Sequence, residues 1–544
     1  MYKKIFTACL LASVSMGAMG QDLAPELYKA STIPDSLKKD ANSVVRFEHA
    51  ELTIKAPGKM LKKYHSLVTV LNEKADKDAV LMLHYDKKFS SVNSVSMIIY
   101  DAEGKVIKKY RKSDMYDRSA IDGISIITDS RILALGHDIA AYPTSIEVIY
   151  ETDANSYLDL GSWDIQDEDK AVQYSAYVVN ANPSLGFRYK SKNISIQPVK
   201  SSENGFDKYT WTVKNLKAVK NEKESKRWAT DPKIIFATRS FSFNGMPGEI
   251  DTWQNFGKWM NTLNADVNTL SEARAEEVRK MTANLATDKE KAKFLYEYMQ
   301  QNMRYVSIQL GIGGLKPFPA MFVDQKKYGD CKALSNYMLA LLKAVNIKSY
   351  YTIINAGENA EPADPAFPSD PFNHIVLCIP FKNDTTWLEC TSNTQPFGRL
   401  GTFTENRNAL LVTEDGGRLV STPKSKAAAN VFNADVNIKL NADGSAISKV
   451  KISGTGEYRD LYIGLAQTKV DEQKEYLLRS MQIKQPAYFE LKPAEDKEGV
   501  KQVNMDMEYD KFYEASAGNK QFYKPHAFAL WSFTCPMLEK RKTD

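Results

Sequence analysis

Hydrophobic and polar residues alternate in short runs from about residue 44 to residue 211. An alternation with a period of two is typical of strands that bury one face. The segment Asp-Ala-Glu-Gly at 101–104 separates two apolar runs and predicts a β-hairpin. Short strands at this spacing predict a β-sandwich. The strongest expected strands are 44–54, 64–71, 97–100, 106–107, 142–150 and 174–179.

The period changes to that of helices after a charged run at 217–226, which we interpret as a solvent-exposed linker or loop. Thr287 and Glu290 have the spacing of a capping box and predict the start of a helix. A second helix is expected to begin at Cys331. The expected buried face of the first helix is Phe294, Leu295, Tyr298 and Met299. Strands are expected after these helices at 350–354, 374–379 and 387–390.

The last part of the chain returns to strand-like alternation, interrupted by one expected helix near 458–481. A length of 544 residues is too great for a single hydrophobic core. The patterns predict an α+β protein with an N-terminal β-sandwich domain (44–245), a central mixed core (246–425) and a C-terminal β-rich domain (426–544). We expect the last domain to be incomplete, because the chain stops soon after the apolar run 528–531 without a closing hairpin.

The first twenty residues have the pattern of a signal peptide. Lys3 and Lys4 precede an apolar stretch that is too short to span a bilayer, and the small residues at 18–20 form a cleavage site near Gly20. The alternative, a buried N-terminal helix, is disfavoured because polar and charged sequence follows at once. We therefore expect an exported protein, periplasmic or extracellular, with no membrane span in the mature chain.

Composition excludes several classes of function. The formal charge is +5, and it is close to +3 without Lys3 and Lys4, too little on this length to indicate a nucleic-acid or anionic-membrane partner. Four cysteines remain after the leader, without CxxC spacing, and the six histidines form no HExxH pair. The sequence therefore predicts neither a disulfide scaffold nor a metal site, and it indicates no cofactor.

Candidate chemistry begins at Cys331. Gly329 and Asp330 suit a turn followed by an N-cap, which places Cys331 in the first turn of an amphipathic helix. Unpaired N–H groups and the partial positive charge at a helix N-terminus stabilise a thiolate and can stabilise a tetrahedral oxyanion. The alternative is a small buried cysteine with no chemical role.

His374 and Glu389 supply partners for such a thiol. His374 opens an apolar strand, and Glu389 lies on the next strand after a turn near 382–384. A carboxylate beside a histidine fixes the imidazole tautomer, so the three residues can form a Cys-His-acid relay. Because side chains alternate along a strand, Cys378 should share the face of His374 while Cys390 faces away from Glu389, so these two cysteines should not form a disulfide.

These segments resemble the transglutaminase-like superfamily. Residues 327–334 contain its Gly-Asp-Cys-Lys signature, 372–374 resemble its histidine strand, and 387–391 with 396–398 resemble its acid motif. The family usually has aspartate where this chain has Glu389. The resemblance extends to exported bacterial proteins with a β-rich N-terminal domain of unknown function, a papain- or transglutaminase-like α+β core and a C-terminal β domain.

The resemblance implies acyl transfer on a peptide or amide substrate, with Cys331 as nucleophile, His374 as base and Glu389 as the orienting acid. It favours hydrolysis by a peptidase or amidase over cross-linking, because bacterial members are often hydrolases. The alternative is an exported binding or scaffold protein with a degenerate core, for which Glu389 is a weak argument. The oligomeric state is left open.

Two further segments have a candidate role. Gln325 precedes Cys331 by six residues, a spacing similar to that of the oxyanion-hole glutamine of papain-like enzymes, although an exposed glutamine in a lysine-rich loop is the favoured interpretation. Residues 357–372 are rich in proline and acidic residues and lead directly into His374. We expect them to form an acidic surface loop on the rim of the cleft, with a plain connector as the alternative.

Overall fold

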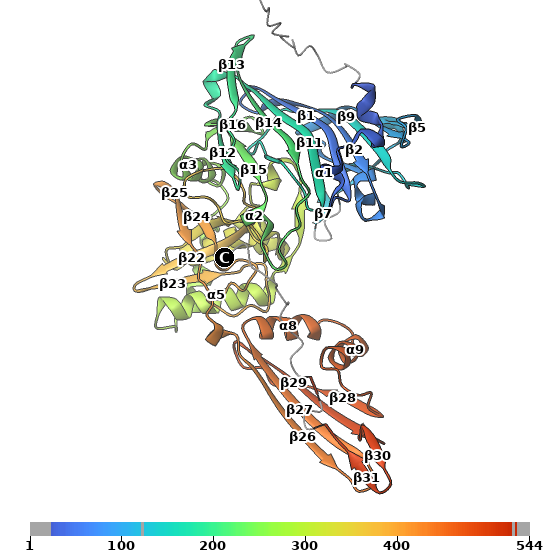
Figure 1. Cartoon of the computed structure of the whole chain (residues 1–544). Coiled ribbons are helices and arrows are strands. Elements are labelled where there is room, and N and C mark those ends of the chain that lie inside the picture. Colours follow the sequence, from blue (N-terminus) through green and yellow to red (C-terminus); the bar gives the residue numbers. More distant parts are fainter. Residues whose placement is uncertain (1–22, 121–124, 525–527, 530–544) are drawn as a thin grey trace, which may run out of the picture.

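The computed structural model describes residues 23–120, 125–524 and 528–529. Three regions follow one another along the chain in Figure 1: strands at one end, a mixed region in the middle, and a smaller sheet with two helices at the other end. This arrangement confirms the α+β fold class. The predicted signal peptide, Cys535 and most of the segment on which the expectation of an incomplete last domain depends, residues 530–544, lie outside the described residues.

The N-terminal region is built on one large sheet of eight strands. All neighbouring strands are antiparallel except β1 and β11, which are parallel. In spatial order the strands are β13 (Val199–Glu203), β14 (Phe206–Leu216), β11 (Lys170–Ala181), β1 (Ser43–Ala56), β2 (Lys59–Val70), β9 (Thr144–Ala154), β4 (Ser90–Tyr100) and β5 (Val106–Arg111).

One face of this sheet is covered by two smaller sheets, because apolar side chains alternate onto that face as the sequence predicts. The short helix α1 (Asp35–Lys38) packs against the sheet through a separate buried cluster. The first small sheet comprises β10 (Ser162–Asp164), β15 (Lys233–Ala237) and β12 (Arg188–Lys192), and the second comprises β3 (Val80–Asp86), β8 (Ser130–Gly136) and β6 (Tyr116–Ser119).

The N-terminal region and the central region share one hydrophobic core. A single cluster of buried residues runs from Trp211 in β14 through Phe256 to Tyr351 and Cys331. Strand β7 (Ser125–Thr128) also pairs in parallel with β19 (Ser307–Gln309). The N-terminal strands are therefore packed directly against the segments that surround Cys331. Other N-terminal elements are the β16 (Ser240–Phe243) and β17 (Met246–Glu249) hairpin and helix α2 (Arg227–Thr230).

The central region places helices around a five-stranded antiparallel sheet. Its strands are β23 (Asp384–Leu388), β22 (His374–Phe381), β21 (Tyr350–Ile354), β24 (Asn408–Thr413) and β25 (Gly416–Ser421). Its helices are α3 (Trp253–Leu263), α4 (Glu272–Thr282), α5 (Asp288–Asn302), α6 (Ala320–Lys326) and α7 (Cys331–Ala344), with β18 (Arg304–Tyr305) and β20 (Tyr328–Gly329) as a short parallel pair.

Helix α5 begins with the predicted capping box, in which Thr287 and Glu290 each accept from the backbone of the other. Its buried face differs from the expected one. Tyr296 is fully buried, and its hydroxyl donates to the backbone oxygen of Glu389 at 2.9 Å, whereas Phe294 is 37% exposed. Leu295 and Met299 belong to both the expected and the observed face, and Ala292 and Tyr296 complete the observed one with i, i+3, i+4, i+7 spacing. The apolar residues Phe294 and Tyr296 on either side left two candidate faces, and packing decides between them.

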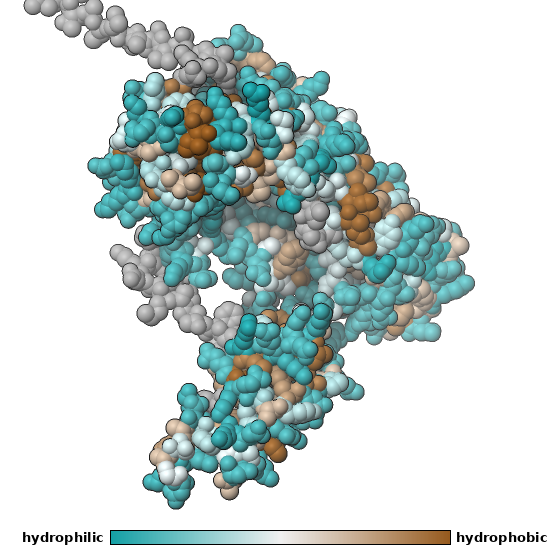
Figure 2. Space-filling view, turned by 90° about the vertical axis from the view of Figure 1, so that its right-hand side faces the viewer, coloured by the Kyte–Doolittle hydropathy of each residue, from teal (hydrophilic) through white to brown (hydrophobic). Residues whose placement is uncertain are grey.

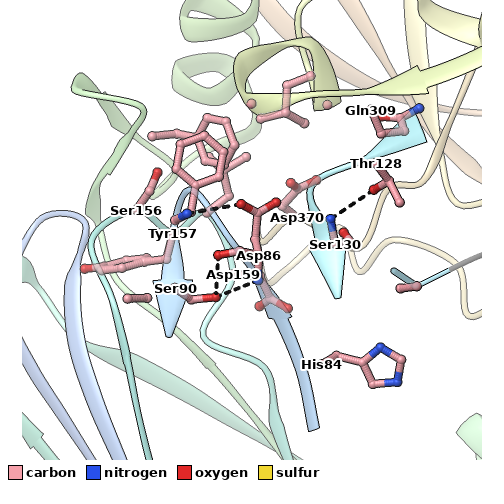
Figure 3. Close-up of a pocket in the computed structure, with 18 of the residues that line it drawn as sticks. His84, Asp86, Ser90, Thr128, Ser130, Ser156, Tyr157, Asp159, Gln309 and Asp370 are labelled. Atoms are coloured by element: carbon pink, nitrogen blue, oxygen red, sulfur yellow. Dashed lines mark hydrogen bonds between the residues drawn. The ribbon is translucent and has the colours of Figure 1, made fainter. Parts of the chain in front are cut away.

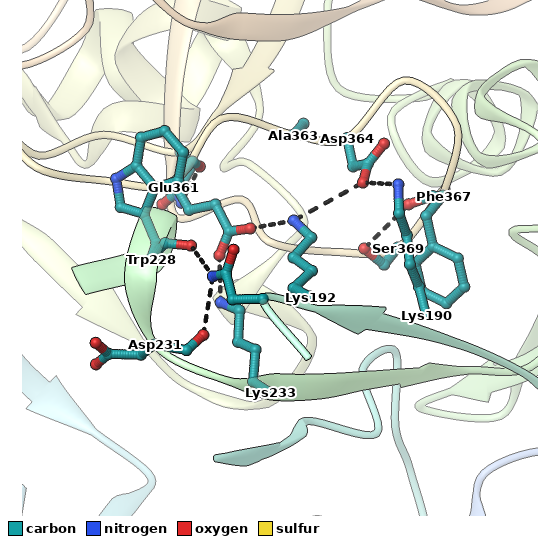
Figure 4. Close-up of polar contacts among 12 residues, drawn as sticks. Lys190, Lys192, Trp228, Asp231, Lys233, Glu361, Ala363, Asp364, Phe367 and Ser369 are labelled. Atoms are coloured by element: carbon teal, nitrogen blue, oxygen red, sulfur yellow. Dashed lines mark hydrogen bonds and ion pairs between the residues drawn. The ribbon is translucent and has the colours of Figure 1, made fainter. Parts of the chain in front are cut away.

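The segment 357–372 joins β21 to β22, and we call it the strap. Two of its acidic residues meet lysines of the N-terminal region (Figure 4): Glu361 pairs with Lys192 and Lys233, and Asp364 pairs with Lys190 and lies 3.8 Å from Lys192. The strap is thus held against β12 and β15. The sequence predicts an acidic surface loop on the rim of the cleft, and the structure adds that two of its acidic side chains pair with lysines of the N-terminal region.

Arg188 adds a further contact to the strap. Its guanidinium lies over the ring of Phe367, with 4.8 Å between the guanidinium carbon and the ring centroid, and it donates to the backbone oxygens of Pro368 and Ile250. At the neck of the strap, the side chain of Asn373 hydrogen-bonds both backbone groups of Ala356. These contacts fix the path of the strap as it leads into β22, whose first residue is His374.

The C-terminal region is a four-stranded antiparallel sheet with two helices on one face. The sequence predicts a single helix at 458–481, which is wrong, because the chain turns at 467–469 and a second helix starts with Asp471 and Glu472 in its first turn. The elements are β26 (Phe432–Leu440), β27 (Ala446–Thr455), β29 (Val500–Tyr509) and β28 (Tyr488–Lys492), with α8 (Glu457–Ala466), α9 (Val470–Ser480) and the hairpin β30 (Ala515–Ala517) and β31 (Lys520–Phe522).

The face of the molecule in Figure 2 is mostly hydrophilic, and hydrophobic residues form separate small groups on it. Among the described residues, no helix is long and apolar enough to cross a membrane.

Candidate active site

Cys331 is the first residue of α7, as the sequence predicts. The N-cap is Asp330, whose carboxylate accepts from the backbone N–H of Ala333 at 2.9 Å. Gly329 lets the chain approach the helix closely, because a Cβ there would lie 2.7 Å from the Cβ of Ala333. The thiol of Cys331 is buried, with 7% of the residue exposed, and it lines a cavity of about 380 Å³.

The helix start also carries a polar network that the sequence did not indicate. Lys332 forms an ion pair with Asp330, and its ammonium donates to the side-chain oxygen of Gln309 at 3.2 Å. The amide nitrogen of Gln309 lies 3.3 Å from Asp330 and 3.1 Å from the hydroxyl of Ser307. Gln309 therefore links β19 to the helix that bears Cys331, and it lines the same cavity.

His374 opens β22 and contacts Glu389. Its Nε2 lies 3.1 Å from both carboxylate oxygens of Glu389, and both side chains are more than nine-tenths buried. The other ring nitrogen, Nδ1, is then the one left to interact with Cys331, whose side chain contributes to the raised pKa of the imidazole. Both Cys331 and His374 line the cavity, and the ring of Phe403 packs edge-on against the imidazole.

The charge of Glu389 governs the protonation of His374. Burial alone would lower the pKa of the imidazole, but the Glu389 carboxylate and then the Cys331 side chain outweigh burial and raise the pKa to about 10. Burial likewise opposes the ionised form of Glu389, and the facing His374 outweighs it and lowers the pKa of the carboxyl. The geometry favours a charged imidazolium-carboxylate pair.

Glutamate fits at this position because it lies just beyond the end of β23. Its Oε1 accepts from the backbone N–H of Thr391 at 3.2 Å and from the Thr391 hydroxyl at 2.5 Å. These bonds fix the longer side chain, so that it meets His374 with both oxygens. The extra methylene relative to aspartate is therefore accommodated.

The other two described cysteines occupy different environments. Cys378 pairs with Trp387 across β22 and β23, and the two side chains belong to one buried cluster. Cys390 belongs to a different buried cluster, which contains Leu377 and Leu388. All three described cysteines are free, as the alternation predicts for the 378–390 pair. Burial raises the pKa of Cys378 to about 12 and raises the pKa of Cys390 as well, so neither thiol ionises readily.

Gln325 does not lie at this site. It is exposed near the end of α6 and is not among the residues that line the cavity, which corrects its candidate role as an oxyanion donor. Gln309 is the glutamine in the cavity wall. Sequence spacing could not reveal it, because β19 is brought there by pairing with β7, about 180 residues away.

The strap contributes Asp370 and Phe372 to the cavity lining, so part of it does form the rim. Among residues 23–120, 125–524 and 528–529, no group of three or more histidine, cysteine or acidic side chains could hold a metal ion.

Comparison with protein families extends the sequence argument. Residues 275–392 match the model of the transglutaminase-like superfamily. The chain contains a transglutaminase-like core. Cys331, His374 and Glu389 all lie within the matched segment, and residues 56–220 match a domain of unknown function, DUF3857. The recognised combination of a β-rich N-terminal domain and a transglutaminase-like core is confirmed.

Solved structures resemble this transglutaminase-like chain in fold. A proposed protease from Parabacteroides distasonis superposes with a TM-score of 0.54 at 11% identity, covering 90% of this chain and 95% of that one. A proposed cysteine protease from Cytophaga hutchinsonii covers 70% of this chain and 94% of that one at 11% identity, but its TM-score of 0.20 supports no argument. No curated protein matches the chain.

Proposed function

We propose that this protein is an exported cysteine peptidase or amidase that acts through Cys331, His374 and Glu389. The observation that carries the proposal is the buried imidazole of His374, which meets Glu389 through Nε2 and lines the same cavity as Cys331 at the N-terminus of α7. The Parabacteroides distasonis protein of similar fold is itself a proposed protease, which agrees with this activity.

Each residue has a distinct role in the proposed reaction. The Cys331 thiolate attacks the carbonyl carbon of a peptide or amide bond, and its proton is held by His374. The carbonyl oxygen becomes an oxyanion, which the backbone N–H groups of the first turn of α7 stabilise. When the C–N bond breaks, His374 gives its proton to the leaving amine and Cys331 is left as a thioester.

Water then resolves the thioester. His374 takes a proton from the water as it attacks, the carboxylic acid product leaves, and the thiolate-imidazolium pair is restored. An amine in place of water would give transfer rather than hydrolysis. Glu389 does not exchange a proton in this scheme; it orients the imidazole and stabilises its positive charge.

Labelling with an electrophile tests the proposal. The mature chain is incubated with a peptide vinyl sulfone, and adducts are located by mass spectrometry. We expect one adduct, on Cys331, and none in Cys331→Ala. Cys378→Ala serves as the matched control and should label like the wild type. Labelling that persists in Cys331→Ala would exclude Cys331 as the nucleophile.

Selective alkylation gives a second readout. Iodoacetamide at about pH 6, below the ~8.5 of a free thiol, should modify Cys331 ahead of Cys378 and Cys390, because burial keeps the latter two protonated. Equal rates at all three sites would contradict the assignment.

The alternative, a scaffold with an inactive core, predicts that neither reagent distinguishes Cys331. The bidentate approach of Glu389 to His374 argues against such a degenerate core. Export is part of the proposal, and N-terminal sequencing of the secreted or periplasmic protein should find Gln21 as the first residue.

A further inference from the structure

A second and larger cleft continues from the cavity at Cys331. Its volume is about 750 Å³, against about 380 Å³ for the cavity at the cysteine. The two share four lining residues: Gln309, Gly314, Leu315 and Asp370. The larger cleft is therefore an extension of the candidate active site, and the combined volume is in the range of specific ligand sites.

The N-terminal region forms most of the extension. Figure 3 shows Asp86 and Ser90 beside the turn from β3 to β4, Thr128 and Ser130 from β7 and β8, and Asp159 from the segment after β9. The central region contributes Gln309, the turn 311–315 and Asp370 of the strap. A substrate lying in this cleft would touch both regions at once.

Carboxylates give the cleft its charge. Asp86, Asp159 and Asp370 line it, and no lysine or arginine is among the described residues that do so. Burial and then the charge of Asp159 raise the pKa of Asp370 to about 7. One cation approaches the rim: the ammonium of Lys88 lies over the ring of Phe89, 5.4 Å from its centroid.

Asp159 and Asp370 lie close enough for the charge of Asp159 to act on Asp370. No three acidic, histidine or cysteine side chains in the described residues gather closely enough to hold a metal ion. Three carboxylates in one cleft suit a ligand that carries more than one positive charge. Apolar side chains between them can contact the aliphatic stems of long cationic residues. These apolar lining residues are Met60, Phe89, Leu158, Phe243 and Leu315.

We propose that this cleft binds the peptide segment that extends from the scissile bond, and that it selects segments bearing lysine or arginine. The N-terminal region is then a specificity-determining part of the peptidase. The link to catalysis rests on the proposed function, whereas the binding itself does not require the thiol.

Binding is therefore measured on the full mature chain carrying Cys331→Ala, near pH 8 and at low salt. Three fluorescein-labelled hexapeptides, alike except for two lysines, two glutamines or two glutamates at the same positions, are titrated by fluorescence anisotropy. We expect the lysine peptide to bind at least about tenfold more tightly than the glutamate peptide, with the glutamine peptide between them. Equal affinities for the three peptides would overturn the proposal.

Variants locate the binding. Adding Asp159→Asn and Asp370→Asn should weaken the lysine peptide about tenfold and leave the glutamine peptide little changed. The matched control, Asp435→Asn with Glu508→Gln, removes two exposed charges from β26 and β29 and should have no effect. Unchanged binding in the Asp159 and Asp370 variant would place the peptide elsewhere and refute the assignment.

Two variants act without removing a carboxylate. Lys88→Gln should strengthen binding of the lysine peptide, because it removes a cation from the rim. Ser130→Lys, opposite Asp86 in the β3–β8 register, should weaken it by placing an ammonium in the cleft. Charge-selective binding in Cys331→Ala without labelling of the wild type would reject the proposed chemistry and keep this site. Labelling of the wild type without charge-selective binding would keep the proposed chemistry and reject this site.

Discussion

Two sets of ion pairs flank the entry to β22, and they differ in burial. The side chains of His374 and Glu389 are 8% and 6% exposed, whereas those of Lys192, Lys233 and Glu361 in the strap contacts are 15–20% exposed. Water screens the second set more than the first. The buried pair can therefore control a protonation state, while the strap pairs mainly hold two regions together.

The two sets of ion pairs also differ in what is lost when one partner is removed. Removing one partner of a buried pair leaves an uncompensated charge and costs about 3–5 kcal/mol, whereas solvent-exposed pairs are typically worth about 0–1 kcal/mol each. The partly exposed strap pairs fall between these limits. Glu361 serves two lysines, so losing one of them leaves it a partner. His374 has one carboxylate, Glu389. We therefore expect variants of the buried pair to have larger effects than variants of the strap pairs.

Glu389→Gln should have the largest effect. It keeps the shape but removes the charge that stabilises the imidazolium, so kcat/KM for peptide hydrolysis, or the rate of vinyl sulfone labelling, should fall about 10²–10⁴-fold. The circular dichroism spectrum should stay native. A rate equal to the wild type would remove Glu389 from the relay.

Glu389→Asp tests the length of the side chain, because it keeps the carboxylate and removes one methylene. The shorter side chain cannot keep both contacts to His374 and the bonds to Thr391, so the labelling rate should fall by about tenfold. A rate above the wild type would show that glutamate is the less effective acid here.

The pH dependence of stability should also distinguish the buried pair. The pKa of His374 is raised from 6.5 to about 10, so its stabilisation is complete below pH 6.5 and is lost as the pH rises through about 10. The pKa of Glu389 is lowered from 4.5, so its stabilisation is present above pH 4.5 and is lost as the pH falls through its value in the folded state. The stabilisation from His374 and that from Glu389 are therefore both present between pH 4.5 and pH 6.5.

Glu389→Gln should therefore reduce the free energy of unfolding more at pH 6 than at pH 9, as measured by urea denaturation of both proteins at each pH. The same difference at the two pH values would show that the His374–Glu389 pair is not charged in the folded protein.

The smallest effect is expected from the strap. Lys192→Gln with Lys233→Gln should lower kcat/KM only about two- to tenfold, because it loosens the segment leading into His374 without touching the relay. Salt should reduce the difference from the wild type, since the pairs are partly exposed. Lys449→Gln with Lys451→Gln on β27 removes the same charge from exposed positions and is the control. A loss as large as that of Glu389→Gln would contradict the comparison.

Local pattern predicted the local structure around Cys331, His374 and Glu389 well. The N-cap at Asp330, the helix start at Cys331 and the facing of His374 and Glu389 each depend on neighbours within one turn or one hairpin. Such interactions are fixed by residue type and spacing, so they can be inferred from sequence. The strand pattern of the N-terminal region was predictable for the same reason.

Other features required contacts between distant segments. The place of Gln309 in the cavity and the pairing of Glu361 with lysines about 130 to 170 residues away have no local signal. The candidate role of Gln325 as an oxyanion donor was wrong for the same reason. Its offset of six residues from Cys331 does not determine which way α6 presents its side chains.

The sequence by itself thus determined the fold class, the thiol at the start of a helix, the imidazole at the start of a strand and the carboxylate that follows the next strand. Only the tertiary structure decided that the N-terminal region shares the core around Cys331 and lines the cleft leading to it. The physical reason is that periodicity sets which side of an element is apolar, whereas the partner that covers that side is chosen by the packing of the whole chain.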